Sequence, residues 1–189
     1  HFPARAKRVI YLFMAGGPSQ LELFDDKPKL RQREGQPLPA SFLGNRRFAF
    51  IPNDAKLLGN RRRFHRFGHS GAEISELLPH IGSIADDIAI VKSVRTEAIN
   101  HGPAKLFINT GSTRPGRPSM GAWVGYGLGS MNENLPAFVV LPDTRGVPPN
   151  GPANWSAGFL PAAHQGTVVR PGAPNPVYDL FPPDKTFVT

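Results

Sequence analysis

Three short apolar runs along the chain have the composition of buried strands. They are Val9–Met14, Ile88–Val94 and Ala137–Leu141. A continuous apolar run is typical of a strand that is buried on both faces of a parallel sheet. We therefore expect these three runs to form the core of one sheet.

Segments with helix start and stop signals separate these runs. Helices are predicted in four places, a short one after Ser19 and longer ones over residues 70–86, 100–110 and 118–128. The first two open on the Ser-x-x-Glu spacing of a capping box, and the last two end before a glycine. The alternation of strands and helices predicts an α/β domain with a mainly parallel sheet and flanking helices.

Residues 29–70 interrupt this alternation. Arg47–Ile51 and Arg63–Phe67 alternate between polar and apolar side chains around a turn at Pro52–Asp54. Residues 45–68 are therefore predicted to be a β-ribbon inserted into the domain. Residues 142–189 are rich in Gly, Pro and Asn and are predicted to be mostly loop. The chain, residues 1–189, is interpreted as part of one domain.

Charge is concentrated in the predicted ribbon. The net charge of the 189 residues is +8, and residues 45–66 hold seven Lys or Arg against one acid, Asp54. One interpretation is a contact with a polyanion such as nucleic acid or an acidic polysaccharide. The other is a solvated ribbon that its cations keep soluble. Stacking aromatic residues do not accompany the charge, so no specific nucleic-acid partner is predicted.

Composition excludes several kinds of site. The chain has no Cys, which excludes disulfides, thiolate nucleophiles and Cys-ligated metals. It has no run of 18 apolar residues, so no membrane span is predicted. The oligomeric state is not predicted.

Candidate chemistry is expected beyond the carboxyl ends of the predicted strands, where ligands bind in open parallel sheets. Three loops qualify, Gly16–Ser19, Thr96–His101 and Asp143–Asn150. The second is the most informative, because it places His101 at a helix N-terminus with Lys105 one turn inside. Free N–H groups and the helix dipole favour an anion there, and His101 would act as a nucleophile or a metal ligand. The alternative is that Asn100 caps the helix and His101 is an exposed residue of the first turn.

The spacing of this loop resembles the sulfatase signature Cys-x-Pro-Ser-Arg, four residues, Thr-Gly, with His101 in the Cys position and Lys105 in the Arg position. Nearly the whole chain also resembles an uncharacterised bacterial family related to sulfatases and alkaline phosphatases, domain of unknown function 1501. The segments that carry this likeness are Ala15–Ser19, Phe24–Asp25, Glu73–Pro79, Asn100–His101, Thr110–Gly111, Arg117–Gly121 and Trp155–Ser156.

The resemblance implies an alkaline-phosphatase-like fold, of which this chain would be the N-terminal portion. It also implies a candidate site. The catalytic residues would be His101, Lys105 and Asn100, the anion would lie at Gly102 and Ser19, and a divalent metal would be held by Glu22 and Asp25. Structural roles are the alternatives: a cap for Ser19 and Glu22, and a surface position for Asp25.

The chain also departs from the sulfatase pattern. Gly16 and Gly17 stand where sulfatases have paired Asp metal ligands, and His101 cannot form the formylglycine nucleophile. Trp155 is interpreted as a loop anchor rather than as a platform for a sugar.

Two functions therefore remain open. One is hydrolysis of sulfate or phosphate esters, with a small molecule or a polysaccharide ester as substrate. The other is a non-catalytic, sulfatase-like protein that binds an anionic polysaccharide. The resemblance further implies export, to the periplasm in a bacterium, through a leader that would precede His1.

Overall fold

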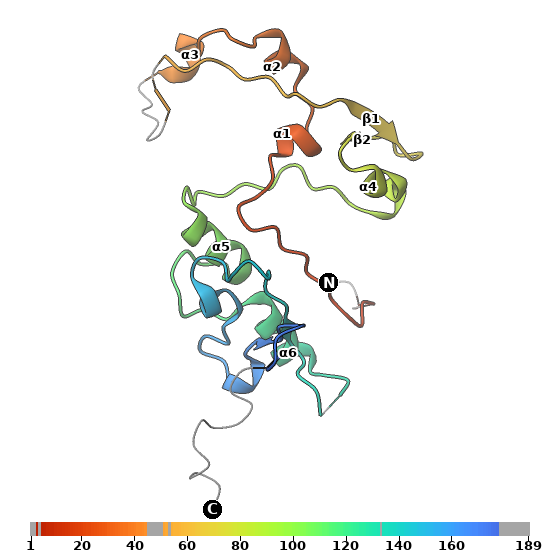
Figure 1. Cartoon of the computed structure of the whole chain (residues 1–189), viewed down its shortest axis with the longest axis vertical. Coiled ribbons are helices and arrows are strands. Elements are labelled where there is room, and N and C mark those ends of the chain that lie inside the picture. The colour runs from red at the N-terminus through yellow and green to blue at the C-terminus, as the bar shows by residue number, and fades with distance from the viewer. Residues whose placement is uncertain (1–2, 4, 45–50, 53, 133, 178–189) are drawn as a thin grey trace, which may run out of the picture. The chain divides into compact units, whose positions relative to one another are not determined.

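The computed structural model describes residues 3, 5–44, 51–52, 54–132 and 134–177 (Figure 1). The chain separates into two compact units, residues 1–94 (unit 1) and 95–189 (unit 2). In the described residues no helix is long and apolar enough to cross a membrane.

Unit 1 consists of short helices and one hairpin. Its elements are α1 (Gln20–Leu23), α2 (Pro28–Gln32), α3 (Ala40–Leu43), β1 (Phe64–Phe67), β2 (Ala72–Ser75), α4 (Pro79–Ser83) and the 3₁₀ turn η1 (Ala85–Asp87). Strands β1 and β2 are antiparallel, with Phe64 opposite Ser75 and Phe67 opposite Ala72. The hairpin contributes the fully buried Ile74 to the core of this unit.

The hairpin turn is held by a carboxylate from η1. Gly68 and Gly71 both have a φ of 65°, which glycine adopts at little cost. Asp86 accepts the N–H groups of His69 at 2.8 Å and of Ser70 at 2.9 Å. Hydrogen bonds to the ionised form, that from the Ser70 N–H first, hold the pKa of Asp86 below its usual value.

Replacing this carboxylate should loosen the hairpin in a pH-dependent way. Because its folded pKa is depressed, Asp86 stabilises the hairpin above the unfolded pKa of about 3.9, and the effect is lost as the pH falls through the folded pKa. In Asp86→Asn we expect faster amide exchange at His69 and Ser70 at pH 6 than in the native chain. The difference should shrink in acid. Asp87→Asn is the matched control, and equal exchange in both variants at pH 6 would contradict the assignment.

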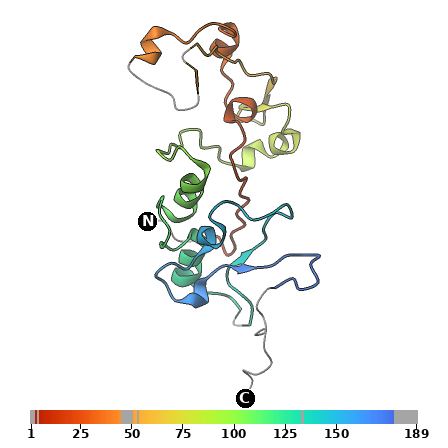
Figure 2. The same cartoon turned by 60° about the vertical axis from the view of Figure 1, so that its left-hand side comes forward.

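Unit 2 is built from two longer helices and a small parallel pair of strands (Figure 2). Its elements are α5 (His101–Thr110), α6 (Met120–Leu128), β3 (Val139–Val140), β4 (Thr167–Val168), and the 3₁₀ turns η2 (Gly151–Trp155) and η3 (Ala162–His164). Strand β3 pairs with β4 in parallel, with Val139 opposite Thr167. Figures 1 and 2 both show η2 beside α5, and the two elements are in contact.

The core of unit 2 gathers around Trp155 and Phe138. Trp155 is only 7% exposed, and its carbonyl accepts the Gly166 N–H at 3.0 Å. A Cβ on Gly121 would overlap the Phe138 ring, so this glycine lets α6 approach the chain leading into β3. The interpretation of Trp155 as a loop anchor is therefore confirmed.

The predicted mainly parallel sheet with flanking helices is wrong. The described residues form two separate two-stranded sheets, one antiparallel and one parallel. Of the three predicted core runs, only Val139–Val140 lies in a strand. The Val9–Met14 run forms no regular element, its side chains are 36–86% exposed, and no strand lies beside it in the described part of the chain. A parallel strand needs neighbours for its N–H and C=O groups, and the described residues supply none to this run.

Local predictions had mixed outcomes. The helices expected over residues 100–110 and 118–128 are confirmed as α5 and α6, and the short helix after Ser19 is α1. The helix expected over residues 70–86 is wrong, because residues 72–75 form β2 and only α4 and η1 follow. The expected ribbon is corrected as well: Phe64–Phe67 pairs with β2. Residues 45–50 and 53 of that ribbon lie outside the described residues.

Candidate functional site

The N-terminus of α5 offers free backbone donors. Asn100 has extended dihedral angles (φ −96°, ψ 149°) before His101, and its side chain makes no capping hydrogen bond. Pro103 has no N–H to donate. In the described part of the chain, the N–H groups of His101 and Gly102 have no acceptor. These donors and the positive end of the helix dipole therefore face an open position.

A buried lysine lies one turn further along the helix. Lys105 is only 8% exposed, and it is paired with no carboxylate of the described residues. It shares the inner stripe of α5 with Gly102, Leu106 and Asn109, at positions i, i+3, i+4 and i+7. Side chains on a helix lean toward its N-terminus, which directs Lys105 toward the first turn. A lysine is rarely buried to this extent without a partner.

The loop before η2 covers this stripe. Asn150 adopts a left-handed φ of 72°, and its Nδ2 donates to the Gly102 carbonyl at 2.7 Å. Asn154 is buried and donates from Nδ2 to the carbonyls of Pro149 and Gly151, while its Oδ1 has no donor among the described residues. Lys105 and the Asn154 amide oxygen, which belong to two contacting elements, therefore both have unused hydrogen-bonding capacity.

Acidic groups are scarce around the helix. Glu97 and Asp143 are the acids among the described residues of unit 2. Arg145 pairs with Asp143 at 2.7 Å, and hydrogen bonds from its guanidinium hold the pKa of Asp143 well below the usual range. The same contact raises the pKa of Arg145. Because Asp143 is engaged in this way, it is not available to neutralise Lys105.

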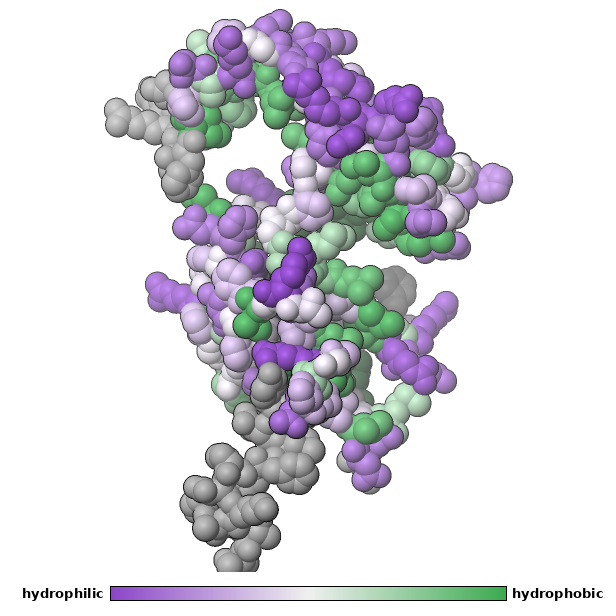
Figure 3. Space-filling view, viewed as in Figure 1, coloured by the Kyte–Doolittle hydropathy of each residue, from purple (hydrophilic) through white to green (hydrophobic). Residues whose placement is uncertain are grey.

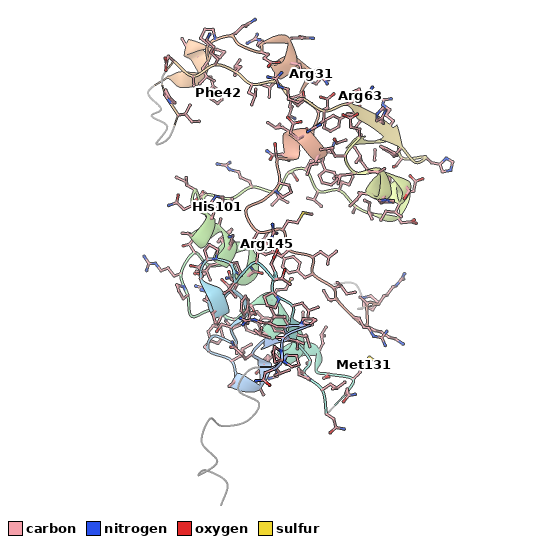
Figure 4. The ribbon with its side chains drawn as sticks, in the orientation of Figure 1. Arg31, Phe42, Arg63, His101, Met131 and Arg145 are labelled. Carbon is pink, nitrogen blue, oxygen red and sulfur yellow. The ribbon has the colours of Figure 1, made fainter. Side chains whose placement is uncertain are left out.

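His101 is exposed at the start of α5, as Figure 4 shows. Its imidazole has no hydrogen-bond partner among the described residues. The structure thus brings four predicted residues to one helix end: Asn100, His101, Gly102 and Lys105. An anion at this position would meet backbone N–H groups and an ammonium, with an imidazole in reach of solvent.

The other predicted site residues belong to unit 1, where they have structural contacts. Ser19 precedes α1 and makes no side-chain capping bond. Both carboxylate oxygens of Glu22 accept the Arg61 N–H at 3.1 Å, and Asp25 pairs with Lys27 at 2.7 Å. No group of three or more His, Asp or Glu side chains in the described residues is placed to hold a metal ion. The metal site predicted at Glu22 and Asp25 therefore stays a prediction.

The arginines around the hairpin are largely paired. Arg63 contacts Glu76 at 3.0 Å, Arg66 contacts Glu73 at 3.6 Å, and Arg61 contacts Glu34. The hydrogen bond from the Arg63 side chain is the main cause that lowers the pKa of Glu76. These pairs neutralise much of the positive charge that a polyanion would meet. The described hairpin therefore supports a polyanion partner less than its sequence indicates.

Asn150 and Asn154 also lie at the site, although the sequence did not identify them as site residues. The loop ending at Asn150 is one of the three expected ligand loops, but neither Asn150 nor Asn154 was assigned a role. The Asn-Gly-Pro order at residues 150–152 predicts a tight turn. The contact that the turn makes with α5 depends on how the loop folds back, for which the sequence carries no local signal.

Comparison with family models gives one match over residues 6–188, to the family described as protein of unknown function (DUF1501). Comparison with curated proteins and with solved structures gives no match.

Proposed function

The chain belongs to the DUF1501 family of proteins of unknown function, and from this premise and the geometry of α5 we propose that it is a hydrolase of sulfate or phosphate esters. The ester's anionic group would bind at the N-terminus of α5. The relationship to sulfatases and alkaline phosphatases, and export from the cytoplasm, are parts of the same proposal.

The burial of Lys105 without an anionic partner carries the proposal. A lysine buried to this extent is rarely left without a partner, and a bound anion would supply one. The free N–H groups of His101 and Gly102 lie on the same helix end and would donate hydrogen bonds to the remaining oxygens. A tetrahedral oxyanion, which has three oxygens besides the ester oxygen, suits such a set of converging donors.

The proposed chemistry uses His101 as the nucleophile. An imidazole nitrogen attacks the sulfur or phosphorus, and the bond to the ester oxygen breaks. This oxygen takes a proton from solvent, to which the later attack of water returns one, and leaves as the alcohol. Water then attacks the sulfo- or phosphohistidine, which releases sulfate or phosphate and restores the neutral imidazole. Lys105 stabilises the charge on the transferring group, and the Asn100 amide, which is not used as a cap, orients its oxygens. One water is consumed for each ester.

Turnover of aryl esters tests this proposal. We expect the full chain to release the phenol from an aryl sulfate or an aryl phosphate, assayed with and without added divalent metals. His101→Ala should slow this release about tenfold or more, and His80→Ala, in the exposed first turn of α4, should not.

Two results would contradict the proposal. One is the absence of turnover in the native chain with every ester and metal, and the other is equal turnover in both histidine variants. If turnover is absent but sulfate binding persists and depends on Lys105, the non-catalytic alternative is favoured, with an anionic polysaccharide as the ligand.

A further inference from the structure

A groove of about 530 Å³ opens at the other end of α5. It runs between the last turn of this helix and α6, and its walls are mainly apolar. The apolar lining side chains are Ile108, Pro118, Met120, Trp123, Val124 and Leu128. The groove lies entirely within unit 2.

The polar side chains in the groove are already engaged. Asn109 donates from Nδ2 to the Lys105 carbonyl, and Thr110 donates from its hydroxyl to the Leu106 carbonyl, both at 2.8 Å. The lining side chains thus leave little free hydrogen-bonding capacity for a polar ligand. An apolar chain gains most from such a surface, because it loses no hydrogen bonds to water on entering.

The lining is exposed to solvent. Ile108 is 56% exposed and Leu128 is 74% exposed, and apolar side chains reach the surface of both units in Figure 3. Trp123 is held by edge contacts with Tyr126, at 6.1 Å between ring centroids, and with Phe159 at 5.8 Å. The groove therefore has one wall of aromatic rings in mutual contact and aliphatic walls that a ligand would cover.

The groove and the anion site lie along one side of α5. His101 and Ile108 are seven residues apart, which places them on nearly the same face of the helix, about 10 Å apart along its axis. Ala104 lies between them on this side, and its small side chain leaves the path open. A single ligand with a head at His101 and an apolar tail can therefore contact both places.

The charge of this region suits an anionic ligand. Residues 98–132 contain no Asp or Glu and include Lys105, Arg114 and Arg117. The last two belong to the loop that joins α5 to α6, next to the groove residues Gly111 and Pro118. In the described part of the chain neither arginine pairs with a carboxylate.

We propose that the groove binds the alkyl chain of an amphiphilic ester, so that the substrate class of the α5 site is long-chain alkyl sulfates or phosphates. This inference rests on the proposed function, because the head of the ester occupies the anion site. The tail leaves the first turn of α5, passes Ala104 and lies against Ile108, Val124 and Leu128.

Binding of two alkyl sulfates to the full chain tests the tail site separately from the head site. The probes are methyl sulfate and octyl sulfate, both used below the concentration at which micelles form. Each fully buried methylene strengthens binding about fourfold, so we expect octyl sulfate to bind at least about tenfold more tightly. The dissociation constant of methyl sulfate divided by that of octyl sulfate should fall toward one in Ile108→Ser and in Leu128→Glu. Met131→Glu adds the same charge at a site outside the groove that is 77% exposed, and it should keep the native ratio (Figure 4).

The outcomes separate the two proposals. If methyl sulfate binds and octyl sulfate binds no more tightly, the tail site is overturned and the anion site is retained. A preference for octyl sulfate that both groove variants retain also overturns the tail site. The same holds if sedimentation shows a dimer and dimer formation abolishes the preference for octyl sulfate, because a second copy of the chain then covers the groove. If neither sulfate binds, the anion site is absent and the tail site is overturned with it.

Discussion

Lys105→Met is expected to weaken sulfate binding about ten- to a hundredfold while leaving unit 2 at least as stable as in the native chain. A hydrogen bond to a charged group contributes about 1.5–3 kcal/mol, which gives the loss of affinity. Stability should not fall, because the variant replaces a largely buried side chain that has no carboxylate partner by an apolar side chain of similar length.

Thermal unfolding with and without sulfate measures both effects in one experiment. A bound ligand raises the midpoint only to the extent that it binds the folded state, so sulfate should stabilise the native chain and have much less effect on Lys105→Met. Arg145→Met is the matched control, since this exposed arginine pairs with Asp143. A variant that loses stability and keeps its response to sulfate would show that Lys105 has a purely structural role.

Gly158→Ala is expected to destabilise unit 2 by about 2–5 kcal/mol, a large share of the stability of a typical domain. Gly158 has a φ of 57°, which costs an alanine about 1–2 kcal/mol. The added Cβ would also lie 2.5 Å from the carbonyl carbon of Arg117 and from the Pro118 nitrogen. These are backbone atoms that cannot rotate away, so the backbone must shift, at a further cost of about 1–3 kcal/mol.

Tryptophan fluorescence during urea unfolding measures this change. The two tryptophans of the chain, Trp123 and Trp155, both belong to unit 2, so the signal follows that unit. Gly127→Ala is the control, because this glycine lies inside α6 with open space around its Cβ position, and the substitution should stabilise the helix by up to about 1 kcal/mol. Similar unfolding midpoints for the two variants would contradict the packing assigned to Gly158.

The sequence predicted those elements whose signals are local. Helix α5 begins after Asn100 and ends at Gly111, whose φ of 71° lets its N–H bond back to the Phe107 carbonyl at 2.8 Å. Helix α6 likewise ends before Gly129. These signals act within a few residues of the helix ends, so the surroundings did not change them.

The predicted sheet was wrong because strands depend on distant partners. Val9–Met14 has the composition of a core strand, yet composition does not supply the neighbour that its backbone needs. The capping-box spacing at Ser70 was misleading for a related reason. The turn at Gly68 and Gly71 lets β2 fold back on β1, and this pairing outweighed the local preference for a helix.

The candidate site was predicted in part. The spacing of His101 and Lys105 identified the helix end, since both lie on one element. The contact between the Asn150 loop and the first turn of α5 could not be predicted, because Asn150 and Gly102 are 48 residues apart. The same holds for the paired arginines of the hairpin, whose acidic partners Glu73 and Glu76 lie on or beside the opposite strand.

The Asn150–Gly151 step also bears on the chemical ageing of the protein. An asparagine before glycine deamidates when the following backbone nitrogen attacks its side-chain amide. In the folded loop both groups are engaged: the Asn150 amide donates to Gly102, and the Gly151 N–H donates to the Pro148 carbonyl at 2.9 Å. Deamidation therefore requires the loop to open. Its product would place a carboxylate beside the first turn of α5 and remove the donor to Gly102, so each damaged molecule would have a loop that closes less readily.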